Sequence, residues 1–119
     1  MRPEWILDAQ LVGLFLLGSV DRMAIGKHRR FDAYAPADFD ALENFLTIAA
    51  ERHDAIVVSP NIWTEVSNLF QKDQSREDSR WARMLPILED VIERFSERYV
   101  PTSKARTRRE FRFLGLPDV

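Results

Sequence analysis

The fold is decided by the stretch Trp5-Ile6-Leu7-Asp8-Ala9-Gln10-Leu11-Val12-Gly13-Leu14-Phe15-Leu16-Leu17-Gly18. It predicts a short apolar strand that ends in one carboxylate, followed at once by an apolar helix that Gly18 closes. A buried and unpaired carboxylate is costly, so Asp8 needs a partner. Two partners fit. Asp8 is either the N-cap of a helix that begins near Ala9, or a ligand of a divalent cation shared with acids further along the chain.

Length and composition indicate one domain with one core. The chain has 119 residues, of which 45% are hydrophobic. Its 17 basic and 19 acidic residues give a net charge of -2, so any charged partner must be recognised locally. The absence of cysteine excludes a disulfide framework, a thiolate metal site and a cysteine nucleophile. The apolar run Leu11–Leu17 is too short to span a bilayer, so we expect a soluble, cytoplasmic protein that does not bind membranes.

The predicted elements alternate along the chain. After the first strand and helix we predict a basic loop at Asp21–Tyr34, a helix at Pro36–Arg52, a buried strand at Ala55–Val58 and a helix at Pro60–Lys72. A polar turn follows at Gln71–Ser79, and then a helical region, Trp81–Phe95, that Pro86 kinks or restarts. The last predicted elements are a short strand at Arg98–Pro101, a basic helix at Lys104–Arg112 and a closing segment at Phe113–Val119. The order strand, helices, strand, helices, strand, helix predicts an α/β fold with a parallel sheet and right-handed crossovers.

The helix that follows Ser59 and Pro60 carries a second candidate site residue, Glu65. Helical spacing gives this helix a buried stripe made of Ile62, Val66, Leu69 and Phe70. Along the shoulder of the stripe runs a polar row of Asn61, Glu65 and Asn68. This row places Glu65 beside the core and near the strand ends, where it could face Asp8. The alternative is an ordinary glutamate at the boundary of the core.

The third candidate is Asp118 in the segment Gly115-Leu116-Pro117-Asp118. A glycine followed by a proline just before an aspartate is typical of the start of a helix, with the aspartate as its cap. Capping is therefore the alternative to a site role, although the sequence ends one residue later.

Together these segments resemble the PIN-domain family of metal-dependent nucleases, over most of the chain. The segments that carry the resemblance are Ile6-Leu7-Asp8-Ala9, Val58-Ser59-Pro60-Asn61-Ile62-Trp63-Thr64-Glu65-Val66-Ser67-Asn68-Leu69 and Leu114-Gly115-Leu116-Pro117-Asp118. The resemblance implies a Rossmann-like, three-layer α/β/α fold. It also implies hydrolysis of RNA phosphodiester bonds at a cluster of acids that binds Mg²⁺ or Mn²⁺.

Carried over to this sequence, the resemblance makes Asp8, Glu65 and Asp118 the catalytic, metal-binding carboxylates. Asn68 becomes a helper that orients a water or a phosphate. Two departures stand out. Gln10 occupies a position where the family has Asn or Ser, and nothing corresponds to the family's Thr-x-Asp segment on a later strand. We therefore expect a single domain, residues 1–119, that lacks the last strands and leaves the strand before Asp8 with an open edge. Such a chain would be a fragment, an incompletely encoded gene product, a homo-oligomer or half of a complementing pair.

Basic residues for binding RNA occur in two local groups. The first loop offers Lys27, Arg29 and Arg30, which we predict to bind substrate. The second group is better interpreted as a solvated helix face: Lys104, Arg106, Arg108, Arg109 and Arg112. We interpret His28 and His53 as surface residues and not as catalytic bases. Trp63 and Trp81 are interpreted as core or interface residues.

The sequence thus favours a Mg²⁺-dependent ribonuclease, either a toxin blocked by an antitoxin protein or an RNA-processing enzyme. The competing class is a catalytically inactive interaction module with the same fold. A phosphatase of the haloacid-dehalogenase type is disfavoured, because Gln10 stands two residues after Asp8 where that chemistry needs a second aspartate.

Overall fold

The computed structural model describes residues 4–75, 80–97 and 111–114. They form a mixed α/β fold in which a parallel sheet is packed with four α-helices. In chain order the elements are β1 (Glu4–Leu7), α1 (Ala9–Asp21), the 3₁₀ turn η1 (Arg22–Ala24), α2 (Pro36–Glu51), β2 (Ala55–Val58), α3 (Ile62–Leu69), the 3₁₀ turn η2 (Gln71–Ser75), α4 (Arg80–Arg94), β3 (Ser96–Glu97) and β4 (Phe111–Leu114).

The strands lie in the order β3-β2-β1-β4, and every neighbouring pair is parallel. The centre of the sheet is the β1–β2 pair, in which Glu4 is aligned with Ala55 and Leu7 with Val58. The predicted open edge of the first strand is therefore wrong, because β1 pairs with β4 on that side. The predicted basic helix is wrong at its last two residues, 111 and 112, which belong to β4. The rest of that helix, Lys104 to Glu110, and the predicted strand Arg98–Pro101 lie outside the described residues.

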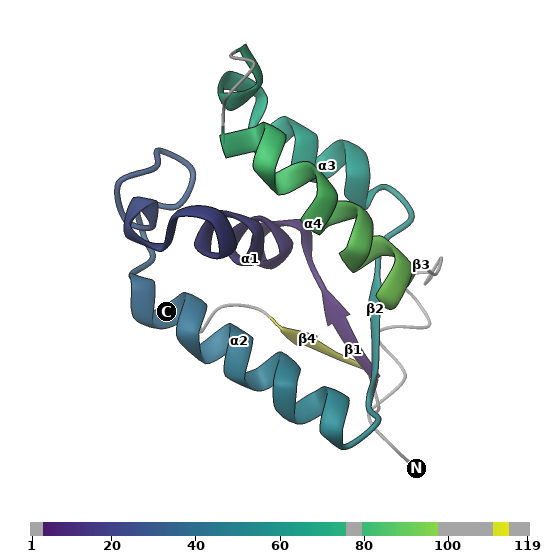
Figure 1. Cartoon of the computed structure of the whole chain (residues 1–119). Helices are drawn as coiled ribbons and strands as arrows, with labels where there is room; N and C mark the ends of the chain where they lie inside the picture. The colour runs from purple at the N-terminus through teal and green to yellow at the C-terminus, as the bar shows by residue number, and fades with distance from the viewer. Residues whose placement is uncertain (1–3, 76–79, 98–110, 115–119) are drawn as a thin grey trace.

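Helix α1 is the centre of the helical layer. It lies between α2 on one side and α3 and α4 on the other (Figure 1). Because neighbours surround it, seven of its thirteen residues are buried, in keeping with a helix that is apolar nearly all round. The prediction that Gly18 ends this helix is wrong. Gly18 lies inside α1 because the ring of Phe39 in α2 comes so close that an added Cβ would lie 2.1 Å from it.

The core joins the sheet to all four helices. Its fully buried side chains include Leu7, Leu14, Leu17, Val58, Ile62, Phe70, Met84 and Leu88. At the amino-terminal end of the β1–β2 pair, the indole Nε1–H of Trp5 donates to Oδ2 of Asp54, 3.1 Å away. The Trp5 ring packs edge-to-face with the ring of Phe45. These contacts fix the turn between α2 and β2 against β1.

Helix boundaries follow local chemistry in α2 and depart from prediction in α3 and α4. Helix α2 begins at Pro36, where the carboxylate of Asp38 accepts a hydrogen bond from the Ala35 N–H. Helix α3 begins at Ile62, two residues later than predicted, and ends at Leu69. The 3₁₀ turn η2 takes the place of the last residues predicted for that helix and of part of the predicted polar turn. Helix α4 runs through Pro86 without a fresh start. Within the described residues, no helix is long and apolar enough to cross a membrane.

Candidate functional site

The carboxyl ends of three strands meet at one edge of the sheet. Leu7 of β1 is in register with Val58 of β2 and with Leu114 of β4. Residues that follow these strands therefore leave the sheet side by side, and ligands of parallel sheets bind at such places. Asp8 follows β1 and Ser59 follows β2, so both belong to this edge, which we call the acid edge.

Asp8 is the N-cap of α1. Its backbone is extended, with φ -80° and ψ 169°, and its Oδ1 accepts a hydrogen bond from the Leu11 N–H at 2.9 Å. This confirms the capping interpretation. The side chain is exposed, and Oδ2 makes no hydrogen bond with the part of the chain that the structure describes. Capping thus uses one oxygen of Asp8 and leaves the other open to a ligand.

Glu65 reaches the acid edge through a serine. Its Oε1 accepts a hydrogen bond from the Ser59 hydroxyl at 2.7 Å, and the same hydroxyl oxygen accepts from the Asn61 N–H at 3.1 Å. The first bond draws the exposed Glu65 side chain back from α3 to the end of β2. Since β2 is the neighbour of β1, Asp8 and the serine that binds Glu65 follow adjacent strands, while Glu65 itself lies on α3.

The third predicted acid, Asp118, lies outside the described residues. Among residues 4–75, 80–97 and 111–114, no group of three or more histidine, cysteine, aspartate or glutamate side chains could hold a metal ion. Two exposed carboxylates nevertheless fit magnesium, which prefers oxygen ligands, keeps several waters and is bound through one or two carboxylates together with substrate phosphates.

Two polar residues beside Asp8 were missed by sequence reasoning. Burial, and next the negative charge of Asp8, raise the pKa of the Tyr34 hydroxyl, while a hydrogen bond with the Gln10 side chain lowers it. The Nε2–H of Gln10 also donates to the backbone carbonyl of Arg30 at 2.9 Å. Gln10 therefore connects the first turn of α1 to the loop that follows η1. Its position two residues after Asp8 was the available signal.

The predicted substrate-binding residues are exposed and lie on two neighbouring elements. Lys27, Arg29 and Arg30 belong to the loop after η1, and the Gln10 hydrogen bond brings Arg30 beside the first turn of α1. Asn68 lies on α3, three residues after Glu65. The side chains of the second basic group, from Lys104 to Arg112, lie outside what the structure describes.

The prediction of a surface position is wrong for His28. This side chain is buried against Phe31 and Phe70, because its two ring nitrogens find polar partners inside the fold. His53 is exposed, as predicted. Trp81 is a core residue, also as predicted, whereas Trp63 is 43% exposed and so is not part of the core.

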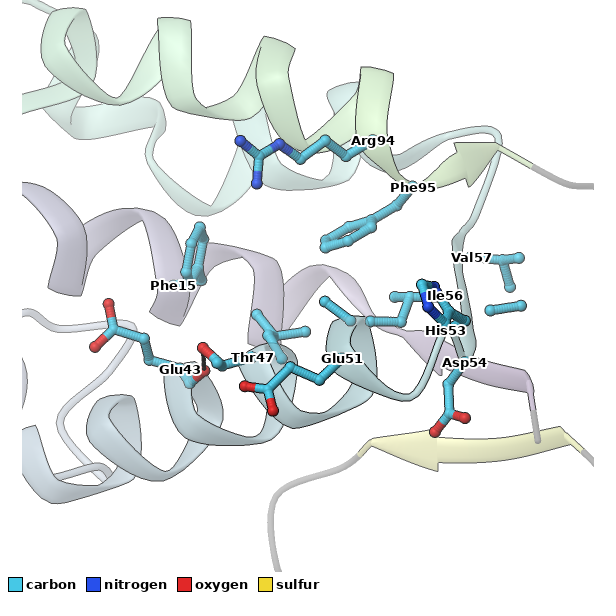
Figure 2. Close-up of a pocket in the computed structure, with 13 residues that line it drawn as sticks. Phe15, Glu43, Thr47, Glu51, His53, Asp54, Ile56, Val57, Arg94 and Phe95 are labelled. Atoms are coloured by element: carbon cyan, nitrogen blue, oxygen red, sulfur yellow. Dashed lines mark hydrogen bonds between the residues drawn. The ribbon is translucent and has the colours of Figure 1, made fainter. Parts of the chain in front are cut away.

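A larger hollow, of about 810 Å³, lies between α2 and the last turn of α4 (Figure 2). Its apolar lining includes Phe15, Leu46, Ile56 and Phe95, and its polar lining includes Glu43, Glu51 and Arg94. The hollow touches β2 at residues 55–57, whereas the acid edge follows its last residue, Val58. Because carboxylates repel phosphates, this lining suits an apolar or basic surface of a protein better than RNA.

Comparison of the chain with protein-family models, with curated proteins and with solved structures gave no match.

Proposed function

We propose that this chain is a metal-dependent ribonuclease with a PIN-like, three-layer α/β/α fold. In this proposal Asp8, Glu65 and Asp118 are the catalytic carboxylates that bind Mg²⁺ or Mn²⁺. Asn68, Lys27, Arg29 and Arg30 hold the RNA. The observation that carries the proposal is that Asp8 follows β1, while Ser59, the hydrogen-bond partner of Glu65, follows the adjacent parallel strand β2.

The chemistry explains why carboxylates are needed there. A Mg²⁺ ion held by such groups lowers the pKa of water and offsets the charge that develops on a phosphodiester. The role of Asp8 and Glu65 is to hold the ion at a fixed place. Asp8 suits this role because its cap bond to Leu11 fixes the side chain. Glu65 suits it because the Ser59 hydroxyl fixes one of its oxygens.

Arginine and lysine side chains on the adjoining loop serve the same reaction by binding the RNA backbone. Arg29 and Arg30 are exposed, and the hydrogen bond from Gln10 places the Arg30 backbone next to α1. Cations in this position attract phosphates toward the acid edge, which on its own would repel them. An antitoxin protein that covers the acid edge, or a role in RNA processing, is compatible with this arrangement.

The test uses substitutions that keep each local hydrogen bond. Asp8→Asn keeps the helix cap, because asparagine caps as well as aspartate does, and Glu65→Gln keeps an oxygen for the Ser59 hydroxyl. Cleavage of a fluorescent single-stranded RNA is measured with Mg²⁺, with Mn²⁺ and with a chelator. Loss of several kcal/mol of metal-assisted stabilisation predicts at least a roughly 100-fold slower reaction for each variant.

The matched control is Glu93→Gln, which removes the same charge from an exposed site on α4 and leaves cleavage unchanged. Metal binding is measured separately by calorimetry. Metal binding without any cleavage that depends on Asp8 would contradict the nuclease proposal.

That outcome would favour the second candidate, a non-catalytic interaction module with the same fold. The specific observation behind this candidate is the hollow between α2 and α4, whose apolar lining includes Phe15, Leu46 and Phe95. A module of this kind binds a protein partner there, and the acidic residues of the sheet edge are then only caps and surface groups.

A further inference from the structure

The basic loop is organised by one buried histidine. The Nδ1 atom of His28 accepts a hydrogen bond from the Arg30 N–H at 3.1 Å, and its Nε2 lies 2.9 Å from Oδ1 of Asp73. Because Nδ1 is an acceptor, the ring proton is on Nε2 and is donated to Asp73. The rings of Phe31 and Phe70 lie 5.5 and 5.4 Å from the imidazole, centre to centre. The imidazole is therefore held at both nitrogens and on its faces.

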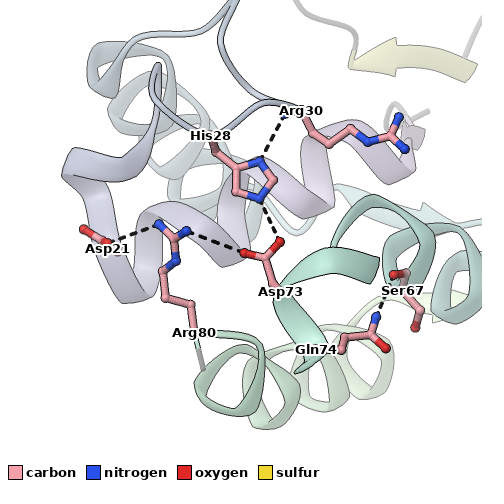
Figure 3. Close-up of polar contacts among 7 residues, drawn as sticks. All are labelled: Asp21, His28, Arg30, Ser67, Asp73, Gln74 and Arg80. Carbon is pink, nitrogen blue, oxygen red and sulfur yellow. Dashed lines mark hydrogen bonds and ion pairs between the residues drawn. The ribbon is translucent and has the colours of Figure 1, made fainter. Parts of the chain in front are cut away.

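Asp73 is fixed in turn by an arginine. Its Oδ2 lies 3.5 Å from one terminal nitrogen of Arg80, and the other terminal nitrogen lies 3.3 Å from Oδ2 of Asp21 (Figure 3). This chain of contacts, from His28 through Asp73 and Arg80 to Asp21, joins the basic loop to η2, α4 and the end of α1. We call it the His28 network.

Arg30 is held at both of its backbone polar groups. Its N–H donates to His28, and its carbonyl oxygen accepts from Gln10, which lies two residues after Asp8. Figure 3 shows the Arg30 side chain extending along α1, away from His28 and from the Asp21 end of that helix. The fold therefore fixes the backbone of an exposed arginine beside the acid edge.

A small hollow of about 70 Å³ opens between the basic loop and the end of α3. The residues that line it include three with cationic side chains and two with amides, besides His28 and Leu69: Arg29, Arg30, Lys72, Asn68 and Gln71. The carboxylate in its lining, Asp73, is only 12% exposed and already engages His28 and Arg80. The volume equals that of about two waters at roughly 30 Å³ each, so it accepts one small anionic group and no nucleobase.

We propose that this hollow binds one backbone phosphate of a single-stranded RNA. Arg29, Arg30 and Asn68 are the residues that contact the phosphate, since guanidinium groups bind phosphate oxygens through paired hydrogen bonds. His28 and Asp73 are positioning residues that act through Arg30. The proposal deepens the proposed function, on which it rests for the path of the strand, by naming the subsite that holds the RNA beside the acid edge.

The experiment measures binding without cleavage. Fluorescence anisotropy of a labelled single-stranded RNA is recorded in the presence of a chelator at several salt concentrations. We expect Arg29→Gln with Arg30→Gln to weaken binding about tenfold or more. The salt slope of log K should fall by about 0.7, which is the contribution of one neutralised phosphate in a single strand. The control Arg83→Gln, an exposed arginine on α4, leaves affinity and slope unchanged.

A positioning role for Asp73 is tested by a double-mutant cycle. Asp73→Ala, which removes the acceptor of the His28 Nε2–H, should weaken RNA binding in the wild-type background and have little further effect once Arg30→Gln is present. Equal effects of Asp73→Ala in both backgrounds would overturn the positioning role. An unchanged salt slope in the Arg29→Gln, Arg30→Gln chain would overturn the phosphate subsite.

Inorganic phosphate identifies the source of the anion. Chemical shift changes at Asn68 and Arg30 on adding phosphate alone, with no matching change on adding RNA, would reveal a site for free phosphate and overturn the RNA proposal. Failure of the proposed function is distinguishable: RNA binding that depends on Arg29 and Arg30 in a chain that cleaves nothing overturns catalysis and leaves the subsite supported.

Discussion

Asp73→Ala tests whether the His28 network holds the fold together as the contacts imply. The substitution removes the acceptor of the His28 Nε2–H, and the imidazole is only 6% exposed. A buried donor left without a partner costs about 1–3 kcal/mol. The ion pair with Arg80 adds little to this cost, because Arg80 is 31% exposed and keeps Asp21. We therefore expect the free energy of unfolding to fall by about 1–3 kcal/mol.

Two further variants separate the hydrogen bond from the charge. Asp73→Asn keeps an oxygen for His28 and should cost about 1 kcal/mol or less, since it loses only charge assistance. Asp90→Ala is the matched control, because its ion pair with Arg94 joins side chains that are 53% and 72% exposed. Exposed pairs with this i,i+4 spacing contribute about 0.3–0.5 kcal/mol.

The assay is urea unfolding, with the midpoint and the slope m fitted for each chain. For a domain of 119 residues, a loss of 1–3 kcal/mol lowers Tm by about 4–12 °C. Hydrogen exchange at the Arg30 amide gives a local readout, because this N–H loses the fixed acceptor on His28. If Asp73→Ala and Asp90→Ala had the same stability, with Arg30 exchange unchanged, the network would not order the loop and the reasoning would be refuted.

Four other predictions follow from single sites. Gly18→Ala should destabilise the chain by up to about 2 kcal/mol in urea unfolding, because the added Cβ meets the Phe39 ring and the overpacking cost of about 1–3 kcal/mol exceeds the gain of about 1 kcal/mol in helix propensity. His53→Gly should raise the unfolding free energy by about 0.5–1 kcal/mol, since residue 53 has φ 59° where helix α2 ends. Asp8→Ala should cost about 0.5–2 kcal/mol, a loss that Asp8→Asn avoids by keeping the cap. Because the pKa of Tyr34 is raised in the folded chain, its contribution to stability is complete below the unfolded pKa of about 10 and is lost as the pH rises through the folded pKa. Tyr34→Phe should therefore flatten the fall in stability at alkaline pH. Asp8→Asn should lower the pKa of Tyr34 in a tyrosinate absorbance titration.

Local patterns predicted the parts of the fold that local chemistry decides. The period of buried residues in α2 and the apolar run of β2 are visible in the sequence, because each depends on residues a few positions apart. The strand β4 was missed entirely, because its first two residues were predicted to be helical and its last two to belong to a closing segment. Arg112 and its basic neighbours are typical of a helix, and only pairing with β1, more than a hundred residues earlier, makes this segment a strand.

In the candidate site, too, the residues with a local signal could be predicted from the sequence, whereas contacts between distant residues could not. Asp8 became a candidate because a strand-to-helix boundary is a local signal, and Glu65 because the spacing of polar residues along α3 is also local. Burial of His28 could not be predicted, since its neighbours Lys27 and Arg29 are exposed cations. The imidazole can be buried because a carboxylate 45 residues away, that of Asp73, accepts its Nε2–H, and nothing in the local pattern indicates that contact.

Gln10 connects the first turn of α1 to the basic loop. A short polar side chain at this position would stay near Asp8, whereas glutamine reaches the carbonyl of Arg30, 20 residues along the chain. The same side chain bonds with the Tyr34 hydroxyl, whose pKa responds to the charge of Asp8. The acid edge and the basic loop are therefore mechanically joined through one residue. Because the hydrogen bond from the Gln10 amide to the Arg30 carbonyl is uncharged, it does not depend on the charge of Asp8.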